Sequence, residues 1–165
     1  MSSMPFRIRR ATASDASTIA AIILPVIRDG TTYALDPDMS DIDALKYWMG
    51  ADKTTFVAEE DGLIVGTYYI RPNQAGGGRH VCNCGYMTRA SATGRGVARR
   101  MCAHSIEYAA AQGYRAMQFN FVISTNERAV RLWQSMGFAI VGRLPDAFLH
   151  RVQGYVDALV MFRAL

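Results

Sequence analysis

Glycine and arginine are concentrated where the chain passes from a predicted strand into a predicted helix. Residues 93–98 read Thr-Gly-Arg-Gly-Val-Ala, and Arg99 and Arg100 follow within one helical turn. Glycines let a ligand approach the backbone, and the N–H groups at a helix start attract an anion that arginine side chains can also bind. The segment therefore predicts a pyrophosphate site, although a simple glycine turn with solvated arginines has the same sequence features.

Two other kinds of phosphate site do not fit this segment. It lacks the Gly-Lys-Ser/Thr ending of a P-loop, and no G-x-G-x-x-G motif follows the first predicted strand. No acidic residue stands where it would hold a ribose. The sequence thus argues against a nucleoside triphosphate site and against a dinucleotide site.

A second segment, residues 126–138, completes a pattern with the first. The loop motif Q/R-x-x-G-x-G/A matches residues 93–98, and the helix motif Asn-x-x-Ala-x-x-Leu-Tyr-x-x-x-Gly-Phe matches residues 126–138. Together, in register and on the same kinds of element, the two segments resemble the GCN5-related N-acetyltransferase (GNAT) superfamily. Within this superfamily, the asparagines in the predicted strands of this chain and its residues 142–145 and 154–158 look most similar to the yeast-type azetidine-2-carboxylate, or proline-analogue, N-acetyltransferases.

The resemblance implies an enzyme, an acyltransferase that moves an acetyl group from acetyl-CoA to the amine of a small amino-acid-like or cyclic imino-acid molecule. The amine would attack directly in a ternary complex, so catalysis would rest on positioning and on N–H groups that stabilise the oxyanion. Family members are often homodimers, which implies a homodimer here. Two alternatives stay open: a non-catalytic acyl-CoA-binding sensor, and an enzyme that acetylates a protein or peptide N-terminus or lysine.

The resemblance also assigns residues to the cofactor. The strand before the glycine loop would pair with the pantetheine arm, and Arg95 with the N–H groups of residues 97–100 would hold the pyrophosphate. The implied cofactor-binding residues are Tyr86, Met87, Thr88, Thr93, Gly94, Arg95, Gly96, Val97, Ala98, Arg99, Asn126 and Trp133.

Two of these residues depart from the family pattern. Thr93 stands where Gln or Arg is usual, which removes one side-chain contact and leaves the backbone cradle. Trp133 stands where many members have the Tyr that protonates the departing thiolate. An indole N–H cannot supply a proton at neutral pH, so another group or water must do so.

Polar residues inside apolar segments are the catalytic candidates. Asn83, Asn120 and Asn126 lie in or beside strands that disfavour asparagine. By the resemblance all three are catalytic, and Asn83 and Asn120 also bind the acceptor; alternatively, they satisfy backbone groups at strand ends and a helix start. Asp157, in the middle of an apolar strand, could deprotonate or bind the amine, or could pair with an Arg or Tyr for structure. Tyr33, on a Gly-Thr-Thr loop, is a further substrate-binding candidate.

Cysteine usage predicts thiols rather than a metal site. Cys82, Cys84 and Cys102 are an odd set, with no further Cys or His at zinc-ligand spacing. We therefore predict buried thiols and no metal. Zinc or redox chemistry at Cys82 and Cys84, and Cys84 as an acyl nucleophile, are weaker alternatives because no His stands in a partnering position.

These residues must be positioned by strands and helices that alternate along the chain. Apolar alternation and β-branched residues predict strands over residues 6–10, 55–59, 63–71, 80–88, 114–123, 138–143 and 155–163. Helical spacing predicts helices over residues 41–49, 96–112 and 126–136, and one from the capping residues 13–15 to about residue 27, which Pro25 ends or kinks. This order predicts a mixed α/β (α+β) fold. The resemblance implies the GNAT fold, a mostly antiparallel mixed sheet of about seven strands flanked by about four helices and splayed between its two middle parallel strands.

Length and composition limit the class of protein. The 165 residues, 50% of them hydrophobic, indicate one domain over residues 1–165 with its own core. A net charge of +4 is small for nucleic-acid binding, and no apolar run is long enough to span a membrane. Residues 1–5 lack the apolar core of a secretory signal. We expect a cytoplasmic protein whose partner is a small amine, with no nucleic acid and no membrane.

Overall fold

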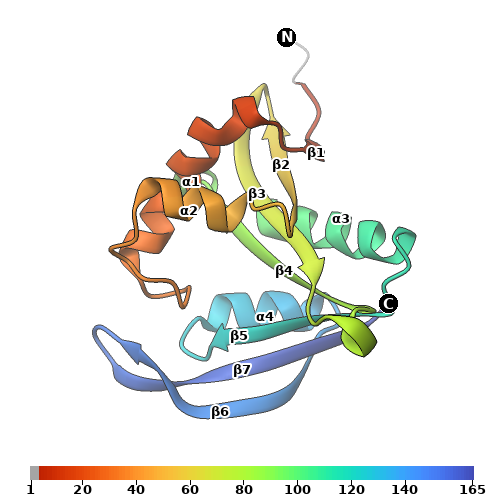
Figure 1. Cartoon of the computed structure of the whole chain (residues 1–165). Coiled ribbons are helices and arrows are strands. Elements are labelled where there is room, and N and C mark those ends of the chain that lie inside the picture. The colour runs from red at the N-terminus through yellow and green to blue at the C-terminus, as the bar shows by residue number, and fades with distance from the viewer. Residues whose placement is uncertain (1–3) are drawn as a thin grey trace.

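A computed structural model of the chain describes residues 4–165, which form one sheet and four α-helices (Figure 1). The strands are β1 (Arg7–Arg10), β2 (Thr54–Glu60), β3 (Leu63–Pro72), β4 (Val81–Thr88), β5 (Ala116–Ile123), β6 (Ala139–His150) and β7 (Gly154–Ala164). The helices are α1 (Ala16–Asp29), α2 (Asp41–Trp48), α3 (Val97–Ala111) and α4 (Glu127–Ser135). The expectation of no signal sequence at residues 1–5 falls partly outside the described residues.

The strands lie in the order β1-β2-β3-β4-β5-β7-β6. Neighbouring strands are antiparallel except β4 and β5, which are parallel. The predicted mixed, mostly antiparallel sheet is therefore confirmed, with the parallel pair in its middle.

Helices cover both faces of the sheet, and each face has its own apolar core (Figure 1). On one face, Ile19 and Ile23 of α1 are buried with Trp48 of α2. Their four-residue spacing belongs to the apolar stripe that predicts an amphipathic helix. The other core contains Met101 of α3, and the partly buried Trp133 of α4 packs against this core. No helix within residues 4–165 is long and apolar enough to cross a membrane.

The first helix runs two residues beyond its predicted end. α1 continues past Pro25 to Asp29, and Gly30, with φ of +68°, then takes the left-handed conformation that closes a helix. Proline removes a single hydrogen bond of the helix ladder, and its place in the penultimate turn limits the damage. Pro25 therefore does not end α1, contrary to one of the two outcomes predicted for it.

The sixth strand is much longer than predicted. It reaches His150 instead of residue 143 and includes Pro145. Its pairing with β7 shifts register between Leu144 and Phe148, and Asp146 has a φ of +49°. Because β6 lies at the edge of the sheet, a bulge and a proline are tolerated there, which the residue types alone do not reveal.

The two parallel strands separate soon after they begin. β4 and β5 pair only at Val81 with Ala116 and at Cys82 with Met117, and from there they diverge toward their carboxyl ends. This is the splay expected of the fold. It leaves one edge of β4 without a neighbouring strand, and the site described next lies there.

Candidate functional site

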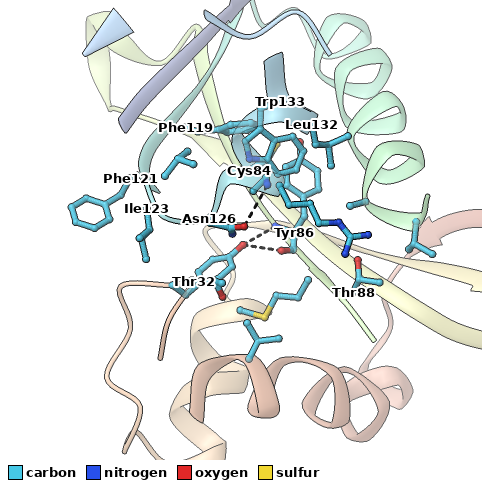
Figure 2. Close-up of a pocket in the computed structure, with 18 of the residues that line it drawn as sticks. Thr32, Cys84, Tyr86, Thr88, Phe119, Phe121, Ile123, Asn126, Leu132 and Trp133 are labelled. Carbon is cyan, nitrogen blue, oxygen red and sulfur yellow. Dashed lines mark hydrogen bonds between the residues drawn. The ribbon is translucent and has the colours of Figure 1, made fainter. Parts of the chain in front are cut away.

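A cavity of about 780 Å³ opens where β4 and β5 diverge (Figure 2). Its walls come from β3, β4, the glycine loop, the first turn of α3, β5, the first turns of α4, and α1 and α2 with the loop between them. Most of the predicted cofactor residues line it: Tyr86, Met87, Thr88, Thr93, Gly94, Gly96, Val97, Ala98, Arg99, Asn126 and Trp133. Segments far apart in the sequence thus meet at one opening of the sheet.

The glycine loop leaves open space at the start of α3. Gly94 and Gly96 have φ values of +83° and +79°, a region that favours glycine. A side chain built on Gly96 would meet nothing within 4 Å. The first N–H groups of α3 have no acceptor within the helix, and they border this space together with the positive end of the helix dipole. The loop can therefore receive an anionic group at its backbone, as the motif predicts.

The arginines of the site differ in part from those predicted. Arg99 lines the cavity, whereas Arg95 does not, because its guanidinium pairs with Glu60 of β2. Arg128 of α4 lines the cavity instead, with Nη2 placed 3.5 Å from the position a Gly94 side chain would take. Arg128 is not among the predicted residues; its place in the first turn of α4, two residues after Asn126, is the sequence signal that points to it.

Tyr33 occupies the open edge of β4. Its hydroxyl donates to the main-chain oxygen of Tyr86 at 3.0 Å and accepts from the Tyr86 N–H at 2.8 Å. Burial raises the pKa of Tyr33, so the hydroxyl keeps its proton at neutral pH. These bonds link the loop between α1 and α2 to the edge of β4 that the resemblance assigns to the pantetheine arm.

Trp133 packs with Tyr86 and Phe119 in a cluster of three aromatic rings in the cavity wall (Figure 2). Its ring centroid is 5.1 Å from that of Tyr86 and 5.0 Å from that of Phe119. Asn126 caps α4, since its Oδ1 accepts from the N–H of Ala129 at 3.4 Å. Asn126 thus accepts a backbone N–H at the start of α4 and also lines the cavity. Its position fits both the structural and the cofactor-binding interpretation.

Asn83 and Asn120 also line the cavity, at the end away from the glycine loop. Asn83 is 7% exposed, and its Nδ2 donates to the main-chain oxygen of Gln118 at 2.9 Å. Asn120 donates through Nδ2 to Oδ1 of Asn73 at 2.6 Å and accepts from Nε2 of Gln118 at 3.0 Å. A register shift in β5 after Phe119 leaves Asn120 outside the regular β5–β7 ladder.

Asp157 is not among the residues that line the cavity. Its carboxylate accepts from the N–H of Asp146 at 3.0 Å and pairs with Arg143 at 2.7 Å, and these contacts lower its pKa. The carboxylate ties β6 to β7 across the bulge. This position fits the structural alternative, an Asp paired with an Arg, and the role of Asp157 on the amine stays a prediction.

The cysteines are buried and free, as predicted. Cys84 lines the cavity, but burial raises its pKa well above the ordinary value. A thiol in this state is a poor nucleophile because the thiolate is the reactive form. Among residues 4–165, no cluster of three His, Cys, Asp or Glu side chains could hold a metal ion.

The charged groups of the cavity are all cations. Within the described part of the chain, no Asp, Glu or His lines it, whereas Arg71, Arg99 and Arg128 do. The cavity therefore favours anionic ligands and offers no carboxylate or imidazole as a proton acceptor.

A mixed sheet splayed at its middle, with a glycine loop and a helix start inside the splay, defines the class of GNAT N-acetyltransferases. Residues 24–138 match the Acetyltransferase (GNAT) family, so the chain belongs to that family and is an acyltransferase. Proteins of this family use acetyl-CoA as the donor.

Individual relatives agree with this assignment. A GCN5-related N-acetyltransferase from Kribbella flavida is 41% identical, with a TM-score of 0.92 over 97% of this chain and 98% of that chain. N-acetyltransferase aca1 of Schizosaccharomyces pombe is 28% identical over 87% of this chain and 77% of its own length. The structure of yncA from Salmonella typhimurium with its cofactor acetyl-CoA has a TM-score of 0.86 over 98% of this chain at 20% identity, which shows the fold alone.

Proposed function

We propose that the protein is an acetyl-CoA-dependent N-acetyltransferase that acts on the amine of a small molecule. The observation that carries this proposal is the cavity between β4 and β5, whose one end combines two left-handed glycines, a helix start and the arginines Arg99 and Arg128. Charge-assisted contacts of this kind suit a pyrophosphate. When bound, acetyl-CoA supplies an activated thioester that an amine can attack directly.

Different residues along the cavity would bind the pyrophosphate, the pantetheine arm and the acceptor. The N–H groups of residues 97–99, with Arg99 and Arg128, would hold the pyrophosphate. The open edge of β4 at Tyr86 and Thr88 would pair with the pantetheine arm once the Tyr33 hydroxyl leaves it. Asn83 and Asn120 would orient the acceptor near that edge, so that catalysis comes mainly from positioning.

Water is the proposed route for protons. Within residues 4–165, the cavity wall holds no carboxylate or imidazole, and Trp133 stands where the family's usual proton donor would be. A released thiol has a pKa near ~8.5, so its thiolate can take a proton from water. The attacking amine correspondingly loses its proton to water before or during attack.

An acyl-CoA sensor is the second candidate function, favoured by the same absence of a carboxylate or imidazole from the described cavity wall. An acceptor panel separates the two: CoA-thiol release from acetyl-CoA is measured with small amines, amino acids, cyclic imino acids, and lysine or N-terminal peptides. Release with a small amine supports the proposal, and release only with peptides would favour a protein acetyltransferase. No release with any acceptor, at saturating bound acetyl-CoA, would leave the sensor as the function.

A further inference from the structure

Arg71 is the cationic residue at the acceptor end of the cavity. It is directly opposite Asn83 in the β3–β4 pairing, near the start of β4, whereas the glycine loop follows the end of β4. Three residue steps separate Asn83 from Tyr86 along β4, which is about 10 Å at ~3.3 Å per residue. Arg71, Asn83 and Tyr86 all line the same cavity, so a small acceptor can lie between Arg71 and the open edge of β4.

The guanidinium of Arg71 has an unused donor. Its Nε is buried and has no hydrogen-bond partner among the described residues. A buried N–H without an acceptor is costly, and exceptions of this kind need an explanation such as an absent ligand. Because arginine has donors in a fixed planar fork, the group that satisfies Nε best is a planar anion such as a carboxylate.

The surroundings of Arg71 also carry an excess positive charge. Its Nη1 lies 3.5 Å from Asp52, and the same carboxylate pairs with Nζ of Lys53 at 3.1 Å. The Lys53 side chain is 4% exposed, and its Nζ lies over the ring of Tyr47 at 4.5 Å. Arg71 and Lys53 thus share the single carboxylate of Asp52, so a second carboxylate would balance the remaining positive charge.

Asn83 provides a hydrogen-bond acceptor beside this cation. Its Nδ2 donates to the main chain of Gln118, which fixes the amide so that Oδ1 remains able to accept. Directly opposed residues in an antiparallel pair have Cβ atoms about 4.5–5.5 Å apart. Arg71 and Asn83 are therefore close enough to bind the carboxylate and the amine that share one α-carbon.

An aromatic wall continues the same pocket. Tyr69 is two residues before Arg71, on the same face of β3, and its hydroxyl bonds that of Tyr47 at 3.2 Å. The Tyr69 ring fits over Gly85, where an added side chain would come within 2.6 Å of the ring. The carbon skeleton of an acceptor would pack on this wall.

We propose that Arg71 determines acceptor specificity by binding the carboxylate of the amino-acid-like or cyclic imino-acid acceptor that the resemblance implies. The proposal rests on the proposed acetyltransferase function and adds the acceptor's chemistry to it. A peptide N-terminus has no free α-carboxylate next to its amine, and a lysine side chain would bring a further cation toward Arg71 and Lys53.

The test measures binding without turnover. The protein is saturated with CoA and titrated by calorimetry with two matched pairs: L-azetidine-2-carboxylate against azetidine, and L-methionine against L-methioninamide. We expect at least one acid to bind about tenfold or more tightly than its partner. Arg71→Gln should remove that preference by weakening the acid alone, and Arg71→Lys should restore part of it.

Two controls show that Arg71→Gln acts locally. Arg79→Gln changes an exposed arginine of the β3–β4 connection outside this cavity and should leave all four affinities unchanged. CoA affinity should be the same in every variant, which reports an intact fold. Three results would overturn the proposal. The wild type could bind each acid and its carboxylate-free partner equally, or bind neither acid. Alternatively, Arg71→Gln could lose as much affinity for the partner as for the acid.

CoA-thiol release on the same samples separates this proposal from the proposed function. Acid preference without acetylation of any probe would keep the carboxylate subsite and reject acetyl transfer. Acetylation of azetidine and L-methioninamide as readily as of the acids would keep acetyl transfer and reject the role of Arg71.

Discussion

At the scale of single residues, the Tyr33 hydroxyl is a competitor for the strand edge that the cofactor needs. Tyr33→Phe removes both hydrogen bonds to Tyr86. We expect the free energy of unfolding of the free protein to fall by about 1–3 kcal/mol, since each of the two bonds contributes roughly 0.5–1.5 kcal/mol. The affinity for acetyl-CoA should rise severalfold, because binding no longer breaks these bonds.

Denaturant titration and calorimetry measure the two effects of Tyr33→Phe separately. Tyr155→Phe is the control, because Tyr155 is 68% exposed and lies outside the cavity. Weaker acetyl-CoA binding in Tyr33→Phe would show that the hydroxyl contacts the cofactor rather than competing with it.

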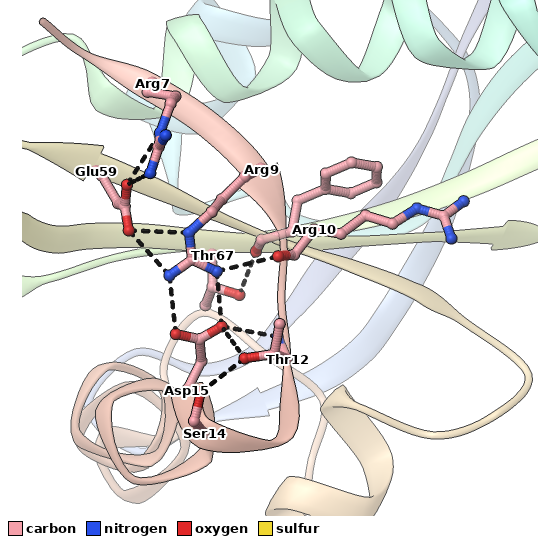
Figure 3. A network of polar contacts seen from close by, with 9 residues as sticks. Arg7, Arg9, Arg10, Thr12, Ser14, Asp15, Glu59 and Thr67 are labelled. Carbon is pink, nitrogen blue, oxygen red and sulfur yellow. Dashed lines mark hydrogen bonds and ion pairs between the residues drawn. The ribbon is translucent and has the colours of Figure 1, made fainter.

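Asp15 anchors the first strand to the first helix (Figure 3). Its carboxylate receives two bonds from Arg9, at 2.8 and 2.9 Å, and one from the N–H of Thr12 at 2.7 Å. Arg9 lowers the pKa of Asp15 to about 2. Since the unfolded value is near ~3.9, the ionised carboxylate stabilises the fold by about 2 kcal/mol at neutral pH.

This stabilisation has a defined pH window. A depressed folded-state pKa gives stability that is present above about pH 4 and is lost as pH falls through about 2. Asp15→Asn should therefore be less stable than the wild type at pH 7, with a difference that shrinks between about pH 4 and 2. Urea unfolding at several pH values measures it, with Asp38→Asn in the exposed loop as control; a pH-independent difference would contradict the account.

Side-chain direction is what sequence reasoning could not supply at this scale. Arg95 and Arg99 both belong to the motif, yet Arg95 turns to Glu60 and only Arg99 lines the cavity. Arg128 and Arg71 reach the cavity from other elements. Which way a long side chain points depends on tertiary partners that lie far away in the sequence.

At the scale of elements, the glycine loop and α3 provide a matched pair of substitutions. Gly96 and Gly113 stand at the two ends of α3, with φ values of +79° and +87°, and an added side chain meets nothing within 4 Å at either. Alanine at either position should cost about 1–2 kcal/mol of stability through backbone strain. Only Gly96 lines the cavity, so only Gly96→Ala should weaken acetyl-CoA binding, by tenfold or more.

Acetyl-CoA titration of both glycine variants checks this prediction, and thermal unfolding confirms that the two are strained alike. Equal affinity losses in Gly96→Ala and Gly113→Ala would show that α3 acts only as a scaffold. Unchanged affinity in Gly96→Ala would remove the loop from the cofactor site.

Local patterns predicted most elements because their apolar periodicity agrees with the final packing. The apolar stripe on α1 is one example. The second half of β6 was missed because Pro145 and Asp146 have the local signature of a turn. Their acceptance into a strand depends on an edge position, which is a property of the whole sheet.

At the scale of the whole molecule, the absence of a carboxylate or imidazole from the described cavity wall has a kinetic consequence. Only a neutral amine attacks a thioester, and the described cavity wall supplies no carboxylate or imidazole to remove its proton. The kcat/KM should therefore rise with pH until the acceptor's own amine is deprotonated. Profiles for two acceptors with different amine pKa values measure this, and one fixed apparent pKa for both would reveal an enzyme base.

The homodimer implied by the resemblance stays a prediction. Exposed apolar side chains on β6, among them Val141 and Leu149, leave that edge of the sheet open to a partner. Sedimentation velocity at several concentrations measures the state directly.

The most direct test of the cofactor site is amide hydrogen exchange with and without acetyl-CoA. Exchange reports backbone groups that a ligand covers or stabilises. We predict slower exchange at residues 86–88 on the open edge of β4 and at residues 94–99 in the glycine loop. Unchanged exchange at both segments, with protection instead around the second cavity near His80 and Tyr114, would contradict the placement of the cofactor between β4 and β5.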